Sequence, residues 1–223
     1  QVYPIIGTVM ILSLYGFPMA VSKLTVERQE ARKSLSLANF YMPMFVVMFA
    51  INMVLFILLK FSAPALASLV GDENLQETYE LAASLFLLIP LLALIRGVSQ
   101  GRGKMQWTAY SQMIEQVVRV AIIIGAAYFV SVGILPIYDV GKFGVLATMI
   151  GMLLAFLVIA LVYFPKTRQI ETVQTSIPWG TYFRTFITFG LIASLNHMIL
   201  IIIQLVDVMT LVPNLLAYGF SPL

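Results

Sequence analysis

Cysteine is absent from the 223 residues of the sequence, and histidine occurs once, as His197. The missing thiols exclude disulfide bonds, thiolate metal sites and cysteine nucleophiles, and a single histidine leaves little basis for a zinc site. Charged residues are also scarce, at 10% of the chain against roughly 25% in an ordinary globular domain. No cluster of titratable residues has a spacing suited to catalysis, so we expect neither an enzyme nor a bound metal or cofactor.

The sequence is rich in apolar residues. Hydrophobic residues make up 61% of the chain, and its mean hydropathy is +0.97. A water-soluble fold of this size could not cover so many apolar side chains, so the composition predicts a membrane protein. The net charge of +3 comes mainly from basic residues in short segments between apolar runs. That distribution suits membrane topology and does not indicate nucleic-acid binding.

Six apolar runs are long enough to cross about 30 Å of hydrocarbon, which takes about 20 helical residues. They are residues 2–21, 38–61, 79–95, 106–135, 143–164 and 182–210. Because backbone polar groups inside lipid must be satisfied within each segment, the predicted fold class is all-α, a polytopic transmembrane helical bundle. Pro43 and Pro90 are expected to interrupt their helices, and residues 62–78 to form either an amphipathic helix on the outer face or a plain loop. The chain opens at Gln1 without a signal-peptide pattern, so we expect an internal piece of a longer protein.

The basic residues alternate between the segments that join these runs. Three segments are basic, whereas the other two carry acidic residues and are flanked only by Lys60 and Lys142. Since basic segments stay in the cytoplasm, the first run is predicted to pass from outside to inside. The predicted cytoplasmic residues are Lys23, Arg28, Arg32, Lys33, Arg96, Arg102, Lys104, Lys166 and Arg168.

A polar stripe follows one face of the fourth run. Thr108, Ser111, Gln112, Glu115 and Arg119 are 3, 1, 3 and 4 residues apart, with Gln116 beside them. Arg119 lies roughly 20 Å along the helix from Met105, well inside the membrane. One interpretation is a Glu115–Arg119 pair that locks two helices together. The other is a water-filled cavity in which Arg119 meets an anionic substrate, since arginine suits phosphate and a buried ion pair is seldom better than apolar packing.

Two further sets of polar residues suggest binding. Arg96, Arg102 and Lys104 are interspersed with three glycines, which suits either collection of a phosphate at the inner leaflet or a tight turn with topology-setting charges. On the sixth run, a carboxylate and two amides lie within about 80° of one another on a helical wheel. Such a group suits sodium or a proton, unless its carboxylate lies at the wet outer interface. These residues are Asn196, Gln204 and Asp207.

Two stretches resemble a known family. They are Arg96-Gly97, Gln100-Gly101, Met105, Thr108-Ala109, Ser111-Gln112, Glu115-Gln116 and Arg119-Val120 in one, and Gly16-Phe17-Pro18-Met19-Ala20-Val21-Ser22-Lys23-Leu24 in the other. The first resembles the segment RGxxQGxxxM...TAxSQxxEQxxRV of the multidrug/oligosaccharidyl-lipid/polysaccharide flippase superfamily. The second resembles GxPxAISKL of its polysaccharide-transport branch, which includes the sporulation stage V protein B type and the lipid II flippases.

The resemblance implies about fourteen helices in two lobes around a central cationic cavity, working by alternating access. The six runs would then be the second to the seventh helices, with residues 1–178 in an N-terminal lobe lacking its first helix and residues 179–223 beginning the C-terminal lobe. Glu115 and Arg119 match the family motif directly. Some relatives use an acidic residue of the seventh helix for sodium, a role that would fall to Asp207.

From these features we expect a flippase for an undecaprenyl-pyrophosphate-linked sugar, first of all the peptidoglycan precursor lipid II, in the bacterial cytoplasmic membrane. A sodium ion or proton would couple transport through Asp207, Gln204 and Asn196. The alternatives are a cation-coupled multidrug exporter of the same superfamily and a non-transporting scaffold for envelope assembly. The expected substrate-binding residues are Arg119, Glu115, Gln112, Ser111, Arg96 and Arg102.

Overall fold

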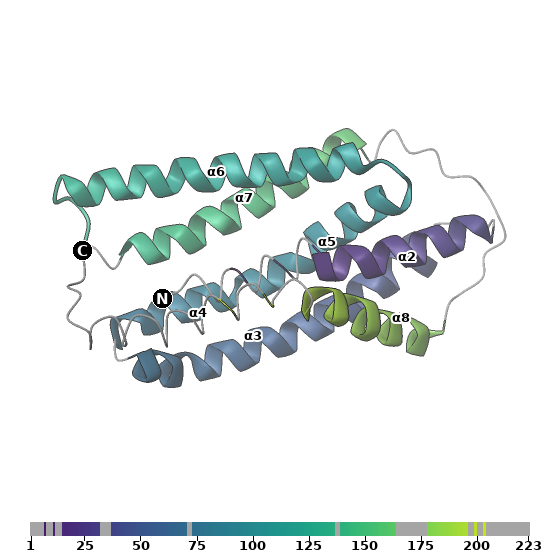
Figure 1. The fold of residues 1–223 in the computed structure, drawn as a ribbon, viewed down its shortest axis with the longest axis horizontal. Helices are drawn as coiled ribbons and strands as arrows, with labels where there is room; N and C mark the ends of the chain where they lie inside the picture. Colours follow the sequence, from purple (N-terminus) through teal and green to yellow (C-terminus); the bar gives the residue numbers. More distant parts are fainter. Residues whose placement is uncertain are drawn as a thin grey trace.

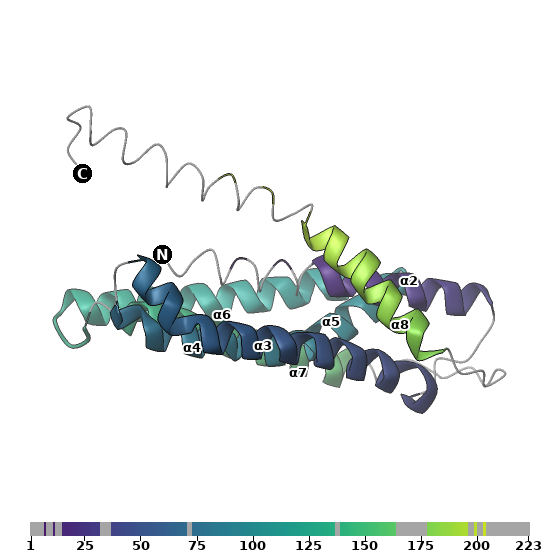
Figure 2. The same ribbon diagram turned by 90° about the horizontal axis from the view of Figure 1, so that it is seen from below.

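The computed structural model describes residues 15–31, 37–70, 73–136, 139–163 and 178–195, together with residues 7, 11, 199 and 203. Within these ranges the regular structure is entirely helical, and long helices run side by side (Figures 1 and 2). The α-helices are α2 (Phe17–Glu30), α3 (Met42–Val70), α4 (Gln76–Ala83), α5 (Leu85–Gly101), α6 (Met105–Ser131), α7 (Asp139–Tyr163) and α8 (Trp179–Thr185). The π-helices η2 (Leu37–Tyr41) and η5 (Phe186–Leu191) and the 3-10 helix η3 (Glu73–Leu75) complete the set.

Four helical stretches are long and apolar enough to cross a membrane. They are Asn39–Ser68, Glu73–Gly101, Met105–Ser131 and Asp139–Leu161, and they correspond to the second to fifth predicted runs. The prediction of an all-α, polytopic membrane protein is therefore confirmed. Of the first and sixth predicted runs, the structure describes mainly the parts in α2 and in α8 with η5.

Residues 62–78 differ from both predictions made for them. Up to Val70 they extend α3, through Pro64, and from Glu73 they form η3 and the start of α4. The extension is held because Ala63 and Ala67 pack against Leu75 and Tyr79 in a small hydrophobic cluster of their own. Apolar burial thus continues the helix beyond the run predicted from hydropathy.

The two prolines differ in their effect on their helices. Pro43 is the second residue of α3 and directly follows the π-helix η2, so the regular α-helix of this span begins beside the proline. Pro90 lies inside α5, which continues through it. The break in this span comes at Ser84, between α4 and α5, where the backbone N–H of Ser84 bonds to the carbonyl of Leu81.

Helix α5 lies at the centre of the bundle, in contact with α2, α3, α6 and α7. Its close packing on α2 depends on glycine. A Cβ atom at Gly97 would lie 2.7 Å from the carbonyl oxygen of Pro18, and one at Gly101 would lie 2.6 Å from Cβ of Thr25. Small residues four apart are a common means of bringing membrane helices together.

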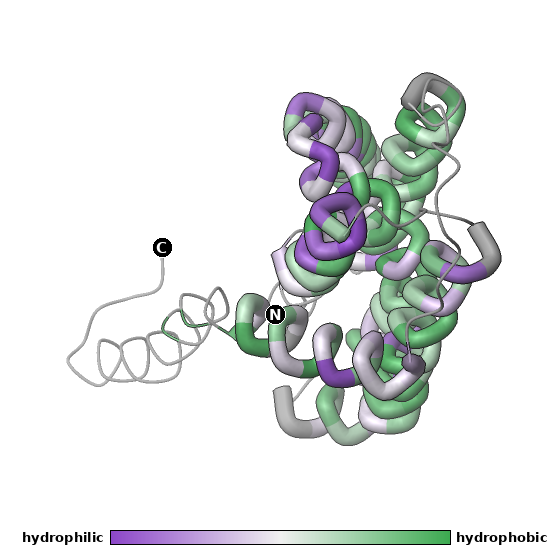
Figure 3. The backbone as a smooth tube through the Cα atoms, turned by 90° about the vertical axis from the view of Figure 1, so that its right-hand side faces the viewer, coloured by the Kyte–Doolittle hydropathy of each residue, from purple (hydrophilic) through white to green (hydrophobic). Residues whose placement is uncertain are grey.

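The two ends of the bundle differ in charge. We call the end where α2 and α5 finish and α6 and α8 begin the inner end; its described charged residues are Lys23, Glu27, Arg28, Glu30, Arg102, Lys104 and Arg184. Figure 3 views the bundle from this end. Several helices are hydrophilic (purple) at the end nearest the viewer and largely hydrophobic (green) along their length. At the opposite end Lys142 of α7 pairs with Glu77 of α4 and with Asp139. This arrangement is the one that the predicted topology requires.

Candidate functional site

The polar stripe of the fourth run lies on α6, and the structure divides it into two rows. Thr108, Ser111 and Glu115 are buried against α5. Gln112 and Arg119 are half-buried and Gln116 is exposed, on the adjacent side of the same helix. The sequence predicted one continuous polar face, whereas packing against α5 covers only half of it.

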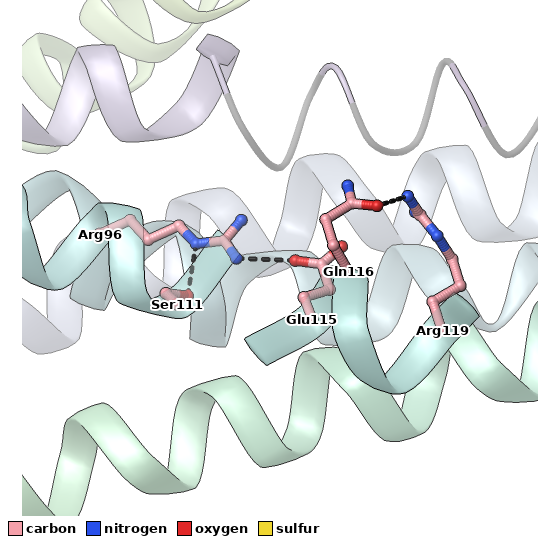
Figure 4. Close-up of polar contacts among 5 residues, drawn as sticks. All are labelled: Arg96, Ser111, Glu115, Gln116 and Arg119. Carbon is pink, nitrogen blue, oxygen red and sulfur yellow. Dashed lines mark hydrogen bonds and ion pairs between the residues drawn. The ribbon is translucent and has the colours of Figure 1, made fainter. Parts of the chain in front are cut away.

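Arg96 of α5 is the point on which the buried row converges (Figure 4). Its Nη2 lies 2.7 Å from Oε2 of Glu115, and its Nε donates a hydrogen bond of 2.8 Å to Oγ of Ser111. The hydroxyl of Thr108 donates to the carbonyl oxygen of Arg96 at 3.4 Å. The side chains of Arg96 and Glu115 are 0% and 1% exposed, so this is a buried ion pair between two membrane-spanning helices.

The ion pair is only partly satisfied by hydrogen bonds. Among the residues that the structure describes, Nη1 of Arg96 and Oε1 of Glu115 have no hydrogen-bond partner. On the other side, α7 closes over Glu115 through a glycine, because a Cβ at Gly151 would lie 2.9 Å from the carbonyl oxygen of Glu115. A buried polar atom without a partner costs about 1–3 kcal/mol, so the pair carries an energetic cost along with its attraction.

The pairing therefore differs from the one that spacing within α6 allowed. Glu115 bonds to Arg96 of the neighbouring helix, and Arg119 donates to Oε1 of Gln116. The reason is that Glu115 lies on the side of α6 that faces α5, where Arg96 already accepts and donates other bonds. Figure 4 shows Gln116 and Arg119 leaving α6 on the side away from α7.

Arg102 lies apart from Arg96 and Glu115, in the turn that joins α5 to α6. It is half-buried and donates a hydrogen bond of 2.8 Å to the hydroxyl of Tyr41. Gly103 supports the turn with a φ of 71°, a conformation that favours glycine. Two of the three glycines of this segment, Gly97 and Gly101, lie against α2 and serve the packing of the two helices.

The predicted cation site on the sixth run, formed by Asn196, Gln204 and Asp207, lies outside the described residues. In the part of the chain that is described, no group of three or more His, Cys, Asp or Glu side chains is placed to hold a metal ion. The coupling ion thus stays a prediction.

One cluster at the inner end was missed from the sequence. Arg28 was assigned to a loop, but α2 continues to Glu30 and Arg28 is only 3% exposed, with its guanidinium 5.5 Å from the ring centroid of Phe40. The hydroxyl of the nearby Tyr182 donates to the carbonyl oxygen of Asn39 at 3.2 Å. The signal was the spacing of the buried residues Val21, Leu24, Thr25 and Arg28, which follows one face of a helix.

Taken together, the described polar groups of α6 can bind and orient a ligand through hydrogen bonds and charge. Arg119, Gln112 and Gln116 offer guanidinium and amide donors on the more accessible side of α6. Arg96 and Glu115 cancel each other's charge, so with Arg119 the cluster carries one net positive charge. Such a surface favours an anionic ligand with hydroxyl or carbonyl groups beside its charge.

Comparison with known proteins relates almost the whole chain to one family. A profile of the family described as polysaccharide biosynthesis protein matches residues 1–217. The chain is 30% identical over 216 residues to the uncharacterized membrane protein YabM of Bacillus subtilis, covering 95% of this chain and 40% of YabM. It is also 30% identical over 128 residues to the lipid II flippase MurJ of Bacillus subtilis, covering 53% of this chain and 24% of MurJ. The chain thus spans less than half the length of either relative, and no solved structure matches it.

Proposed function

The chain belongs to the family of polysaccharide biosynthesis proteins, and from this premise we propose that it is part of a flippase for a lipid-linked oligosaccharide. It is a multi-pass protein of the cytoplasmic membrane. In this role it moves the sugar headgroup from the inner to the outer leaflet by alternating access. The observation that carries the proposal is the position of Arg119, a half-buried cation on a membrane-spanning helix that bonds to the amide of Gln116 and lies about two turns from Gln112.

The energetics of burying charge support this role. A charged side chain at the bilayer centre costs on the order of 3 kcal/mol on insertion scales, so it is retained where it faces water or a partner. Arg119 lies within the span Met105–Ser131, and the carboxylate nearest to it in sequence, Glu115, is bonded to Arg96. The net positive charge of the cluster is therefore carried at Arg119, on the side of α6 that is less covered.

The donor groups on this side suit a diphosphate joined to a sugar. The planar guanidinium of Arg119 makes paired, charge-assisted hydrogen bonds to phosphate oxygens. The amides of Gln112 and Gln116 both donate and accept hydrogen bonds, as recognition of sugar hydroxyls requires. The lipid tail would remain in the bilayer while the headgroup crosses.

Lipid II is our first candidate for the substrate, in its undecaprenyl-pyrophosphate-linked form. Support comes from the likeness to MurJ over 128 residues, since the name of that protein includes this substrate. We further propose that residues 1–178 belong to an N-terminal lobe and residues 179–223 begin a second lobe. Asp207, Gln204 and Asn196 are the proposed site of a coupling sodium ion or proton, and we propose no catalytic step.

A multidrug exporter of the same superfamily is the second candidate. Such a protein takes organic cations, for which an acidic or aromatic cavity would be expected. The net positive charge of Arg96, Glu115 and Arg119 counts against it. In a non-transporting scaffold these residues would serve only to pack the helices together. The full burial of Arg96 and Glu115 agrees with that interpretation, whereas the partial exposure of Arg119 does not.

The test is removal of the charge at position 119. The natural-length protein with Arg119→Ala, reconstituted in phosphatidylethanolamine and phosphatidylglycerol vesicles, should flip a fluorescent undecaprenyl-pyrophosphate-linked saccharide at least about tenfold more slowly, because a charge-assisted bond is worth about 1.5–3 kcal/mol. Insertion into the membrane should be unchanged. Arg184→Ala, which removes an exposed arginine on α8, is the matched control and should flip normally. A fully active Arg119→Ala protein would remove the basis of the proposal.

A further inference from the structure

Helix α6 spans the membrane, yet most of its fully buried side chains are polar. Its buried residues are Thr108, Ser111, Glu115 and Ala126, and the first three of these are polar. Its large apolar side chains point outward, among them Met113, Val117 and Ile124, which are 62%, 63% and 64% exposed. Side chains such as Ile114 and Trp107 are half-buried against the core, whereas the fully buried face of α6 is mainly polar.

All three buried polar residues of α6 bond to the same residue. Thr108 contacts the carbonyl of Arg96, Ser111 contacts its Nε, and Glu115 contacts its Nη2. From Thr108 to Glu115 these contacts span about 10 Å along α6, since each residue adds 1.5 Å. Turning α6 by one residue position, or about 100°, would break every one of them.

Arg96 is itself firmly placed. Its neighbours Ile95, Gly97 and Val98 are all buried, and Gly97 packs directly on α2. Helix α6 also packs along the length of α7, and beside Glu115 this contact is made by Gly151, which touches the backbone of Glu115 and has no side chain to interlock. The hydrogen bonds to Arg96 thus help to set the rotation of α6 at the level of Ser111 and Glu115.

We propose that Arg96, acting through Ser111 and Glu115, is a positioning residue that turns Gln116 and Arg119 toward the substrate. The inference rests on the proposed function and changes the roles first expected of Arg96, Ser111 and Glu115. Buried and bonded to one another, these three do not touch the headgroup. Gln116 follows Glu115 directly and Arg119 lies one turn further on, so any rotation of α6 carries both of them with it.

The experiment separates orientation from transport. These 223 residues contain no cysteine, so once any cysteine elsewhere in the natural-length protein is replaced by serine, a single added thiol reports the environment of one position. Gln116→Cys should react quickly with a hydrophilic maleimide, and Val117→Cys, at the same depth but on another side of the helix, should react slowly. These reporters are placed in the natural-length protein with native Arg96 and Glu115, with Arg96→Met/Glu115→Leu, and with the exchanged pair Arg96→Glu/Glu115→Arg. Flipping is measured in the same three proteins without the added cysteine, because Gln116 is itself a proposed binding residue.

The apolar pair should insert normally but lose the orientation of α6. We expect thiol labelling at position 116 to slow about tenfold and flipping to slow by tenfold or more, since a misplacement of about 1 Å can cost 100-fold. The exchanged pair retains an ion pair and a hydroxyl partner at Ser111, so it should restore both rates to within about threefold. Ser111→Ala leaves the ion pair intact and should slow labelling by a smaller factor. This variant replaces the exchanged pair as the test of orientation if the exchanged pair does not insert.

Two results would overturn the inference. One is that Arg96→Met/Glu115→Leu is labelled and flips the saccharide at the same rates as the protein with native Arg96 and Glu115. The ion pair would then contribute to stability alone. The other is loss of flipping with unchanged labelling at position 116, which would mean that Arg96 or Glu115 contacts the substrate. Failure of the proposed function looks different, because the protein with native Arg96 and Glu115 would then not flip the saccharide at all, whatever the labelling rate at position 116.

Discussion

At the scale of single residues, the ion pair between Arg96 and Glu115 dominates the interior of the bundle. Both side chains are almost wholly buried, and each retains one polar atom without a partner among the described residues. Removing one partner leaves the other charge buried, unpaired and poorly solvated. Removing both partners leaves no buried charge. Stability should therefore respond very differently to single and double substitutions.

We predict that Glu115→Leu lowers the free energy of unfolding by about 3–5 kcal/mol, because Arg96 is left as an uncompensated buried charge. The double substitution Arg96→Met/Glu115→Leu should recover most of that loss. Thermal unfolding of the detergent-purified protein measures both. A double variant as unstable as the single one would contradict the ion-pair argument and would indicate that packing volume decides.

At the scale of helices, small residues determine how closely neighbours approach. Gly101 brings α5 against Thr25 of α2, whereas a Cβ atom added at Gly125 of α6 would meet no other atom within 4 Å. The two positions hold the same residue and differ only in what lies beside them. They form a matched pair for testing the helix contact.

Gly101→Ala should destabilise the protein by about 1–3 kcal/mol, because the new Cβ would lie 2.6 Å from Cβ of Thr25 and the helices must move apart. Gly125→Ala should be neutral or stabilising by up to about 1 kcal/mol, since alanine favours helix over glycine. The melting temperatures of the two variants, compared with the parent, test this. Equal losses at both positions would argue against the close contact of α2 and α5.

Hydropathy predicted the spans of these helices well and their partners poorly. The runs for α3, α6 and α7 were found because their apolar length is a property of local sequence. The partner of Glu115 was not found, because Arg96 lies 19 residues away and only the packing of α5 on α6 brings the two together. Arg28 was missed for a related reason, since its burial depends on Phe40 of a different helix.

At the scale of the whole molecule, charge separates the two ends of the bundle. Lys104 lies in the exposed turn between α5 and α6 at the inner end, and Glu73 is exposed at the other end. Basic segments are retained in the cytoplasm during insertion, which assigns the first of these residues to the inside. The orientation of the described bundle follows from that assignment.

Cysteine substitution at these two residues tests the orientation. In intact cells, an impermeant maleimide should label Glu73→Cys and should label Lys104→Cys only after the membrane is opened. Both positions are exposed, so a difference in labelling reports sidedness and not burial. The reverse pattern would invert the topology and with it the predicted direction of the first run.

The interruption at Ser84 gives one membrane span two separate attachments. On the outer side of it, α4 is tied to α7, where Glu77 pairs with Lys142 and Thr78 lies beside Gly141. On the inner side, α5 is tied to α2 through Gly97 and Gly101. A continuous helix would behave as a single stiff rod between these anchors, whereas a jointed one can tilt one half while the other stays in register with its neighbour.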